Sequence, residues 1–530
     1  MYWNPDGIRQ KLQELRTVAQ QQDIHIILLG ETILNPKTQI KLPNFHIYRR
    51  DEVTSQGAAY RGTAVLVRRD IVHQELELPS YQTMRSIGIR MEAAGEELRI
   101  YAAYHPPGTP FCSSDIRRVM EGDTPIIIAG DLNAKNPAWG SRVITPPGLE
   151  LYEDAEKSLY DVLGPEEPTH VPTDPRRHPD VLDIVLTRNV NYPIVVEVLY
   201  DLPSQHLPLL ITLGLKAVTT PPRAFKTRVD WRLYCQHIQQ RPPAHHPIST
   251  ANDVEAAATR ITNNIKEALH AASTVVPITA RRDDLPREIC VQIKRKRALR
   301  KLWARTRCPR IKTQLNTLSE ELSVAVQAFR GEAWDRRIQK ADEYDASLYK
   351  LNRQLTKTKP PVCPLTNNAG KRCYDAKGRA DILVEHFEEQ FMPNPASAEF
   401  MELHARKESR VQEFLSSPAP PLAGEWFISP AELRRTVTRL QPRKAPGHDG
   451  ITNAALRQLP NRVLVELGRL YNGILRTSHF PEDWKKGKVI VLPKPGKDRR
   501  RAASYRPITL LPHIAKLFER LLLRRLRPCI

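Results

Sequence analysis

The sequence contains few cysteines, and they are scattered. Seven occur in 530 residues, at positions 112, 235, 290, 308, 363, 373 and 529, and no pair has the short spacing of a zinc site or a disulfide framework. This pattern excludes a disulfide-stabilised secreted scaffold and is typical of a protein in a reducing compartment. Long apolar runs are absent too, since no stretch approaches the roughly 18 residues that span a bilayer. The N-terminus, Trp3-Asn4-Pro5-Asp6-Gly7, does not resemble a secretory signal. We therefore expect a soluble, intracellular protein with no membrane partner.

Charge is distributed unevenly along the chain, whose net charge is +21. Residues 1–215 contain 21 Lys and Arg against 28 Asp and Glu, whereas residues 216–530 contain 59 against 31. An acidic region can concentrate divalent cations, and a basic region is the electrostatic footprint of a protein that binds a polyanion. The length is too great for one hydrophobic core, so about three domains are expected.

The clearest local signal surrounds Asp131. Ile126–Ala129 is a short apolar run after a proline, which predicts a strand buried on both faces, and Gly130 allows the chain to turn after it. Alternate side chains of an extended chain share a face, so we expect Asp131 and Asn133 to converge on one bound group. The alternative interpretation is an ordinary Asx turn that closes the strand.

Polar residues also follow other predicted strands. The pattern predicts a helix over 8–22 and further strands at 24–29, 63–67, 86–91, 98–104, 181–186 and 207–213, arranged as two packed sheets. The polar groups at or near these elements are Asn4, Glu31, Tyr104, Asp183 and His206. An unpaired carboxylate in an apolar strand is costly, so we expect His206 to pair with Asp183. Each residue has a purely structural explanation on its own, but together they form a set suited to metal-assisted phosphodiester hydrolysis.

Several motifs in this region resemble, in order, those of the endonuclease/exonuclease/phosphatase family. They are Trp3-Asn4-Pro5-Asp6-Gly7-Ile8, Leu29-Gly30-Glu31-Thr32, Tyr104-His105-Pro106-Pro107, Gly130-Asp131-Leu132-Asn133-Ala134, Leu182-Asp183-Ile184-Val185 and Ser204-Gln205-His206-Leu207-Pro208. More narrowly, the stretches 133–141 and 168–170 resemble the endonuclease of jockey-like non-LTR retrotransposons. The resemblance implies an α/β protein with a four-layer α/β/β/α sandwich nuclease fold.

The same resemblance assigns roles to the candidate residues. It implies that Glu31 holds a Mg²⁺ ion, for which Mn²⁺ can substitute, and that no small-molecule cofactor is needed. Asp131 would orient the attacking water, Asn4, Tyr104 and Asn133 would surround the phosphate, and His206, backed by Asp183, would stabilise the transition state of a nick that leaves a 3′ hydroxyl. The residues implied to bind nucleic acid in this region are Asn136, Trp139 and Thr169.

One position departs from the family pattern. The family has Ser-Asp-His where this chain has Ser204-Gln205-His206, so a second carboxylate near the metal is absent. An amide is a poorer ligand than a carboxylate for Mg²⁺. We therefore expect Gln205→Asp to raise activity, unless Asp201 already replaces the lost carboxylate.

The middle region, residues 216–424, has the composition of a basic helical linker region. Proline-rich linkers are predicted at 218–223, 241–243 and 391–424, and helices at 251–275 and 286–357. Basic residues cluster between 287 and 307. They form either a solvated helix face or a phosphate-binding surface, and the neighbouring nuclease favours the second interpretation.

Residues 425–530 resemble the opening motifs of non-LTR reverse transcriptases, a partial fingers and palm segment. Ser429-Pro430-Ala431-Glu432 is a capping box, and helices are predicted at 453–459, 461–477 and 514–527. The resemblance implies that Lys494 and Arg506 lie near the template or the incoming nucleotide. The sequence reaches Ile530 before any metal-binding aspartate pair, so we expect no polymerisation by this chain.

The sequence thus predicts a truncated retrotransposon polyprotein that comprises a Mg²⁺-dependent DNA endonuclease (1–215), the basic helical region and the beginning of a reverse transcriptase. Its expected partners are a DNA target and the element RNA, and its expected location is the nucleus, with a cytoplasmic ribonucleoprotein stage. Two alternatives remain open. One is a catalytically dead remnant that binds nucleic acid, and the other is a phosphatase on the same fold.

Overall fold

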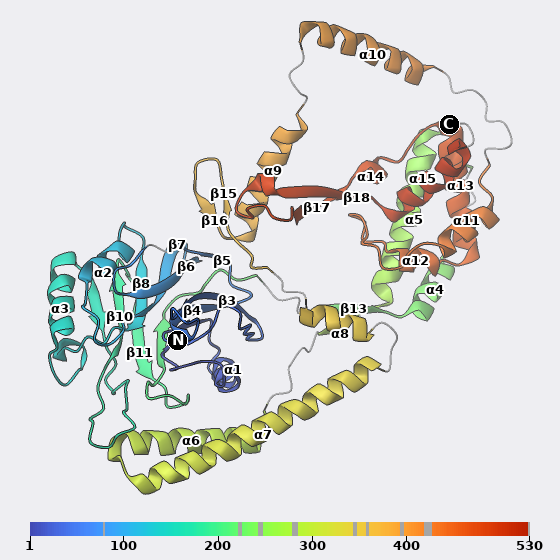
Figure 1. Cartoon of the computed structure of the whole chain (residues 1–530). Helices are drawn as coiled ribbons and strands as arrows, with labels where there is room; N and C mark the ends of the chain where they lie inside the picture. The colour runs from blue at the N-terminus through green and yellow to red at the C-terminus, as the bar shows by residue number, and fades with distance from the viewer. Residues whose placement is uncertain are drawn as a thin grey trace. The chain divides into compact units, whose positions relative to one another are not determined.

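The chain forms two compact units (Figure 1). The computed structural model describes residues 1–77, 80–220, 225–241, 247–277, 285–342, 347–356, 360–392, 397–417 and 427–527. The first unit contains residues 1–222 and 280–380, and the second contains residues 223–279 and 381–530. These units do not follow the predicted boundaries after 215 and 424, because the middle region contributes to both.

Two six-stranded sheets form the centre of the first unit. The first sheet has the order β11 (Ile194–Val198), β12 (Leu209–Leu213), β1 (Tyr2–Trp3), β2 (Ile26–Leu29), β4 (Ala59–Arg68), β3 (Phe45–Val53). The second has the order β5 (His73–Glu75), β6 (Arg85–Ala93), β7 (Glu96–Tyr104), β8 (Ile126–Asp131), β10 (Asp183–Arg188), β9 (Asp161–Leu163). The pairs β1–β2 and β7–β8 are parallel, and the other neighbours are antiparallel.

Three apolar clusters separate four layers in this unit. One cluster fills the space between the two sheets, a second lies between the first sheet and α1 (Leu12–Gln21), and a third lies between the second sheet and the helices α2 (Ser113–Val119) and α3 (Pro146–Ser158). Residues 126–129 of β8 are all apolar because both faces of this strand are buried. Ile126 and Ile128 face the helices, whereas Ile127 and Ala129 face the other sheet. The predicted four-layer α/β/β/α sandwich and the doubly buried strand are confirmed.

A helical hairpin from the middle region belongs to the first unit and packs against its sandwich. It consists of α6 (Arg287–Thr306) and α7 (Pro309–Asp342), joined by contacts among Ile289, Ile293 and Leu322. Trp303 and Leu315 of the hairpin are buried with Val171, Tyr200 and Leu207. Helix α8 (Ser347–Thr356) and the short strands β15 (Leu365–Thr366) and β16 (Arg372–Cys373) follow.

The second unit is mainly helical. Its core joins residues of α4 (Trp231–Gln239), α5 (Ala251–Ala271), α11 (Pro430–Thr438), α12 (Asn453–Arg457), α13 (Asn461–Thr477), α14 (Glu482–Lys485) and α15 (His513–Leu526). The unit also contains α10 (Ala398–Ser416), the hairpin β13 (Phe225–Val229) and β14 (Ser273–Pro277), and the hairpin β17 (Lys488–Pro493) and β18 (Tyr505–Leu510). Helix α9 (Ala376–Phe391) crosses the boundary between the two units.

The helix predictions for this unit hold well, with one error. Ser429 accepts a hydrogen bond from the backbone of Glu432 and begins α11 as expected, and α13 has the predicted bounds. The helix predicted to reach residue 275 instead ends at Ala271, because Thr274, Val275 and Val276 are β-branched and pair as a strand. The linker predicted at 391–424 is wrong over most of its length, because Ala398–Ser416 forms helix α10. The prolines of the predicted linkers at 221–222, 242–243, 393, 395, 418, 420 and 421 lie outside the described residues. Among the helices in the described ranges, none has the length and apolar composition of a membrane span.

Candidate active site

Five strand ends converge at one edge of the sandwich. Asp131 ends β8 and lies directly opposite Asp183, the first residue of β10, while Tyr104 ends β7 and pairs in parallel register with Asp131. The first sheet supplies Asn4 after β1 and Glu31 after β2, two parallel neighbours. Parallel strands end at the same edge of a sheet, so both sheets deliver their polar residues to one place.

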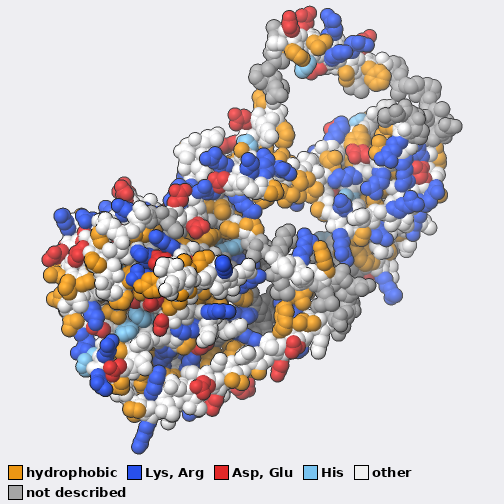
Figure 2. All heavy atoms as spheres, viewed as in Figure 1, with side chains coloured by type: hydrophobic (Ala, Val, Ile, Leu, Met, Phe, Trp, Pro, Cys, Tyr) orange, Lys and Arg blue, Asp and Glu red, His pale blue; other side chains and the backbone are white. Residues whose placement is uncertain are grey.

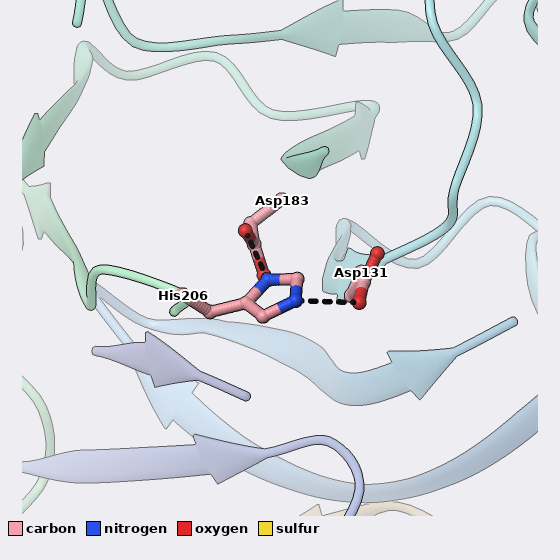
Figure 3. A group of neighbouring side chains, drawn as sticks. All are labelled: Asp131, Asp183 and His206. Carbon is pink, nitrogen blue, oxygen red and sulfur yellow. Dashed lines mark hydrogen bonds and ion pairs between the residues drawn. The ribbon is translucent and has the colours of Figure 1, made fainter. Parts of the chain in front are cut away.

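The imidazole of His206 lies between two aspartates (Figure 3). Its Nδ1 is 2.9 Å from Oδ2 of Asp183, and its Nε2 is 3.6 Å from Oδ2 of Asp131. The carboxylate of Asp183 is fully buried, and one potential ligand atom from each of the three residues lies within 4.8 Å of the others. The predicted pairing of Asp183 with His206 is confirmed.

The electrostatics of this cluster favour a charged imidazole. Burial alone would lower the pKa of His206, but the carboxylates of Asp183 and Asp131 outweigh that effect and raise it to about 9. Burial raises the pKa of Asp131 to about 7 against the opposing effect of His206, and the charge of Asp183 adds to the rise. At neutral pH the site thus contains an imidazolium and a carboxyl group that can exchange a proton.

Asn4 connects this cluster to Glu31. Its amide Nδ2 donates to Oδ2 of Asp131 at 2.9 Å and to Oε2 of Glu31 at 3.2 Å. The pKa of Tyr104 is raised by burial and by the neighbouring charges of Glu31 and Asp131, so its phenol keeps its proton. The predicted residues Asn4, Glu31, Tyr104, Asp131, Asp183 and His206 therefore belong to one site.

The residues around Asn4 have the chemistry of a magnesium site. Carboxylate oxygens of Glu31 and Asp131 approach the same amide nitrogen, and hard oxygen ligands of this kind suit Mg²⁺ and Mn²⁺. His206 is less suited to bind a metal, because both ring nitrogens face carboxylates and its raised pKa favours the protonated form. Glu31 and Asp131 are thus the residues that fit a divalent cation best.

Asn133 does not share a face with Asp131. Strand β8 ends at Asp131, and Asn133 has a positive φ of 49°, so the alternation of an extended chain stops before it. Its backbone N–H donates to Oδ1 of Asp131 at 3.3 Å, and its side chain donates to the carbonyl of His105 at 2.8 Å. The Asx-turn interpretation describes this backbone, and the strand alternation that was expected to bring the two side chains together ends before Asn133, so its place at the phosphate stays a prediction.

The three residues of this unit that were predicted to bind nucleic acid have buried structural roles. Asn136 caps the short helix η1 (Pro137–Trp139), and the indole of Trp139 donates to the carbonyl of Ala134. The hydroxyl of Thr169, which is fully buried, accepts hydrogen bonds from the backbone of Leu182 and Asp183 at 2.9 and 3.0 Å. The side chains of all three residues are buried, so their contact with nucleic acid stays a prediction. Thr169 fixes the backbone that presents Asp183.

The side chain of Gln205 is exposed and bound elsewhere. Its Oε1 accepts a hydrogen bond from the backbone of Thr173 at 2.9 Å. Asp201, the proposed replacement, forms an ion pair with Arg297 of α6. The carboxylate of Asp201 is thus engaged with α6, which argues against its role as the replacement acid, and the effect of Gln205→Asp stays a prediction.

Three further residues contribute to the site, although the sequence assigned none of them a role there. The hydroxyl of Tyr2 donates to the carbonyl of Ala103 at 3.2 Å and accepts from the backbone of Asp131 at 2.8 Å, which ties the two sheets together beneath the aspartate. The ring of His170 lies 4.6 Å from that of His206. Burial and the charge of His206 lower the pKa of His170 to about 4, so it is neutral at pH 7. Ser204 is the third, and its hydroxyl lies within hydrogen-bond distance of the carbonyls of Asn4 and His206. Its only sequence signal is its place in the motif that contains His206.

The remaining basic candidates divide between the two units. Lys494 and Arg506 belong to the β17–β18 hairpin of the second unit, where Lys494 donates to the carbonyl of Ala503 and Arg506 is exposed. On α6, Lys296 pairs with Glu14, and Lys301 and Arg305 both pair with Glu167. These side chains pair with acidic groups of the same unit, but Lys301 and Arg305 share the single carboxylate of Glu167, so one positive charge remains and the phosphate-binding interpretation of α6 stays a prediction.

Comparisons with known proteins agree with this geometry. Residues 1–249 match the endonuclease/exonuclease/phosphatase family. A Drosophila melanogaster protein named "Probable RNA-directed DNA polymerase from transposon X-element" is 32% identical over 540 residues. The RNA-directed DNA polymerase from mobile element jockey of the same species is 27% identical over 537 residues. Each alignment covers 99% of this chain, which spans 58% of the length of either relative.

Solved structures include similar chains. The endonuclease domain of TRAS1, a telomere-specific non-LTR retrotransposon, is 19% identical, and the match covers 40% of this chain and 95% of that domain with a TM-score of 0.32.

Proposed function

We propose that the endonuclease/exonuclease/phosphatase family domain at the N-terminus of this chain is a Mg²⁺-dependent endonuclease that nicks DNA for a non-LTR retrotransposon. The observation that carries the proposal is the unbroken chain of contacts from Glu31 through Asn4, Asp131 and His206 to Asp183. The arrangement places the carboxyl group of Asp131, the imidazolium of His206 and the amide of Asn4 around the position where a phosphate would bind.

Each residue of the site has its own role in the proposed hydrolysis. Asp131, whose pKa is raised to about 7, orients the attacking water and takes its proton. Asn4 and Tyr104 donate hydrogen bonds to the phosphate oxygens. His206 holds a positive charge against the charge that develops in the transition state, and Asp183 fixes its ring. A Mg²⁺ ion held chiefly by Glu31 would supply Lewis-acid stabilisation of the phosphate, and the carboxylate of Asp131 would then take the proton of the water.

The names of the relatives extend this proposal to the whole chain. They are RNA-directed DNA polymerases of mobile elements, so we propose that the second unit contains the beginning of a reverse transcriptase. Its partners would be the target DNA and the element RNA, and its place of action the nucleus. Lys494 and Arg506 would lie on the nucleic-acid side of the β17–β18 hairpin.

The test is a nicking assay with supercoiled plasmid. We expect relaxed product with Mg²⁺ or Mn²⁺ and none with a chelator, and we expect Asp131→Ala and His206→Ala to lose about 100-fold or more of the rate. Parent-like nicking by both variants would refute the assignment.

Two further results distinguish the alternatives. Salt-dependent DNA binding by the parent without cleavage would favour the inactive remnant. Hydrolysis of p-nitrophenyl phosphate without nicking would favour a phosphatase.

A further inference from the structure

Helix α6 buries two cationic side chains against the sandwich of the first unit, to which it belongs. The side chains of Lys296 and Arg300 lie four residues apart and so on one face, and these residues are only 6% and 8% exposed. Burying a cation without a partner is very costly, so each must be compensated by groups of the unit on which the helix packs. Helix α6 is therefore bound to the sandwich through specific polar contacts.

The partners of these cations lie on two segments. Lys296 Nζ is 2.6 Å from Oε2 of Glu14 in α1, and Arg297 pairs with Asp201. Arg300 Nη2 donates to the backbone carbonyl of Ser204 at 2.6 Å. Arg297 and Arg300 therefore attach α6 to the segment 201–206, which carries His206.

Ser204 links two residues of the active site. Its hydroxyl lies within hydrogen-bond distance of the carbonyls of Asn4 and His206, at 2.8 and 2.7 Å, and accepts from the indole of Trp3 at 3.0 Å. The hydroxyl thus bridges the backbones that present the amide of Asn4 and the imidazole of His206. Arg300 holds the carbonyl of Ser204, so a displacement of α6 would also displace the side chains of Asn4 and His206.

The environment of Arg300 supports a fixed geometry. Burial lowers its pKa to about 10, although the charges of Glu14 and Asp201 act in the opposite direction. It therefore remains protonated at neutral pH and keeps its donors directed at the carbonyl.

We propose that Arg300 is a positioning residue of the nuclease site, which acts through the carbonyl of Ser204 to hold His206 against Asp131. The proposal rests on the proposed nuclease activity. It makes the middle region part of the nuclease. Displacing a catalytic group by about 1 Å can lower a rate by up to about 100-fold, so we expect a loss of 10-fold to 100-fold when this donor is removed.

The experiment compares full-length variants. Arg300→Met keeps the length of the side chain but removes its donors, Arg300→Lys restores one charged donor, and Arg310→Met changes an exposed arginine of the same hairpin as a control. Single-turnover nicking rates are measured at saturating protein, with DNA affinity from fluorescence anisotropy and the thermal transition of each variant. We expect Arg300→Met to nick 10-fold to 100-fold more slowly with unchanged DNA affinity, Arg300→Lys to recover part of the rate, and Arg310→Met to match the parent.

Other results would overturn the proposal. A folded Arg300→Met protein that nicks at the parent rate would do so. Equal losses in Arg300→Met and Arg300→Lys, together with a lowered thermal transition, would also contradict it and leave a purely structural role for the arginine.

A second measurement separates this proposal from the proposed function. In protein labelled with ¹⁵N-histidine, the imidazole signals of His206, identified from His206→Gln, should move in Arg300→Met and not in Arg310→Met. If the parent does not nick, the proposed function fails, whereas the NMR result still decides the position of His206. Unchanged His206 signals would refute the positioning role.

Discussion

The two units use their basic residues differently. In the first unit, Lys296, Arg297 and Lys301 of α6 pair with carboxylates of the same unit. In the second unit, exposed basic residues lie on the β17–β18 hairpin and on α11 and α13 (Figure 2). Those of the hairpin include Lys488, Lys497 and Arg506. A run of cations in a sequence therefore predicts nucleic-acid binding only after its internal partners have been identified.

A related contrast concerns buried charge. The first unit buries Asp131 and Asp183 with His206 between them, and it buries Lys296 and Arg300 beside the segment that carries this histidine. The second unit also buries the titratable groups Asp449 and His513, but they lie beside a large core of aliphatic and aromatic side chains rather than in a cluster of two carboxylates and a histidine. Substitutions of buried polar residues should thus impair chemistry in the first unit, and substitutions of exposed cations should weaken binding by the second.

The largest effect should come from Asp183→Asn. An amide keeps the volume of the buried carboxylate and can still accept the Nδ1 hydrogen bond through its oxygen, but it removes the negative charge that raises the pKa of His206. We expect the single-turnover nicking rate to fall about 100-fold or more, with unchanged affinity for DNA. Asp174→Asn, at an exposed position, serves as the control. Parent-like nicking by Asp183→Asn would show that the buried pair has no part in catalysis.

A smaller loss is expected for Tyr2→Phe. The variant keeps the ring but leaves the buried backbone N–H of Asp131 without the acceptor that now lies 2.8 Å away. An unsatisfied buried donor costs about 1–3 kcal/mol, so the thermal transition of the first unit should fall. We also expect nicking on the order of 10-fold slower, because Asp131 loses its anchor. Tyr152→Phe on the exposed surface of α3 should change neither quantity.

The next test concerns the exposed basic residues of the second unit and their binding to nucleic acid. Replacing Lys488, Lys497 and Arg506 by Gln should weaken binding to single-stranded DNA and RNA and reduce the salt slope by up to about one for each lost phosphate contact. Replacing Lys301 by Gln, which leaves Glu167 paired with Arg305, should change the slope much less. If this single replacement changed the slope as much as the three replacements on the hairpin, the proposed difference between the units would be wrong.

The sequence could predict those parts of the site that have a local signature. The apolar run before Asp131 required a buried strand, and the acid within the run at 181–186 required a partner. The motif order then allowed Asn4, Glu31, Tyr104 and His206 to be recognised as members of the same site. Likewise, α13 was predictable because its apolar residues recur at helical spacing on one face.

The remaining features depend on contacts between distant parts of the chain. Arg300 lies 96 residues from Ser204 in the sequence, and nothing near either residue indicates their hydrogen bond. Tyr2 precedes Asp131 by 129 residues, and its hydroxyl is useful only because the two sheets pack face to face. Strand β3, whose side chains are mostly half-buried, lacks the strong apolar pattern that revealed β8. These features could not be read from local periodicity.

The smallest effect should follow from Gln205→Asp, which the sequence alone predicted to raise activity. In the structure, the side chain of Gln205 is exposed and accepts a hydrogen bond from the backbone of Thr173, whereas the site is assembled from Glu31, Asn4 and Asp131. Aspartate is one methylene shorter but can still accept from that N–H, so we expect its carboxylate to remain outside the metal site. Nicking across a Mg²⁺ titration should stay within about 3-fold of the parent, since surface changes of this kind have small effects.

The matched variant is Gln205→Ala, which removes the acceptor without adding charge. If both variants nick like the parent and require the same Mg²⁺ concentration, position 205 is a loop contact and the family's acidic residue is dispensable here. A Gln205→Asp protein that nicks more than 10-fold faster, or reaches half its maximal rate at a clearly lower Mg²⁺ concentration, would restore the original expectation. It would also mean that the loop around residue 205 turns toward Glu31 when DNA and metal bind, so that an exposed residue of the first unit, and not only its buried ones, would affect catalysis.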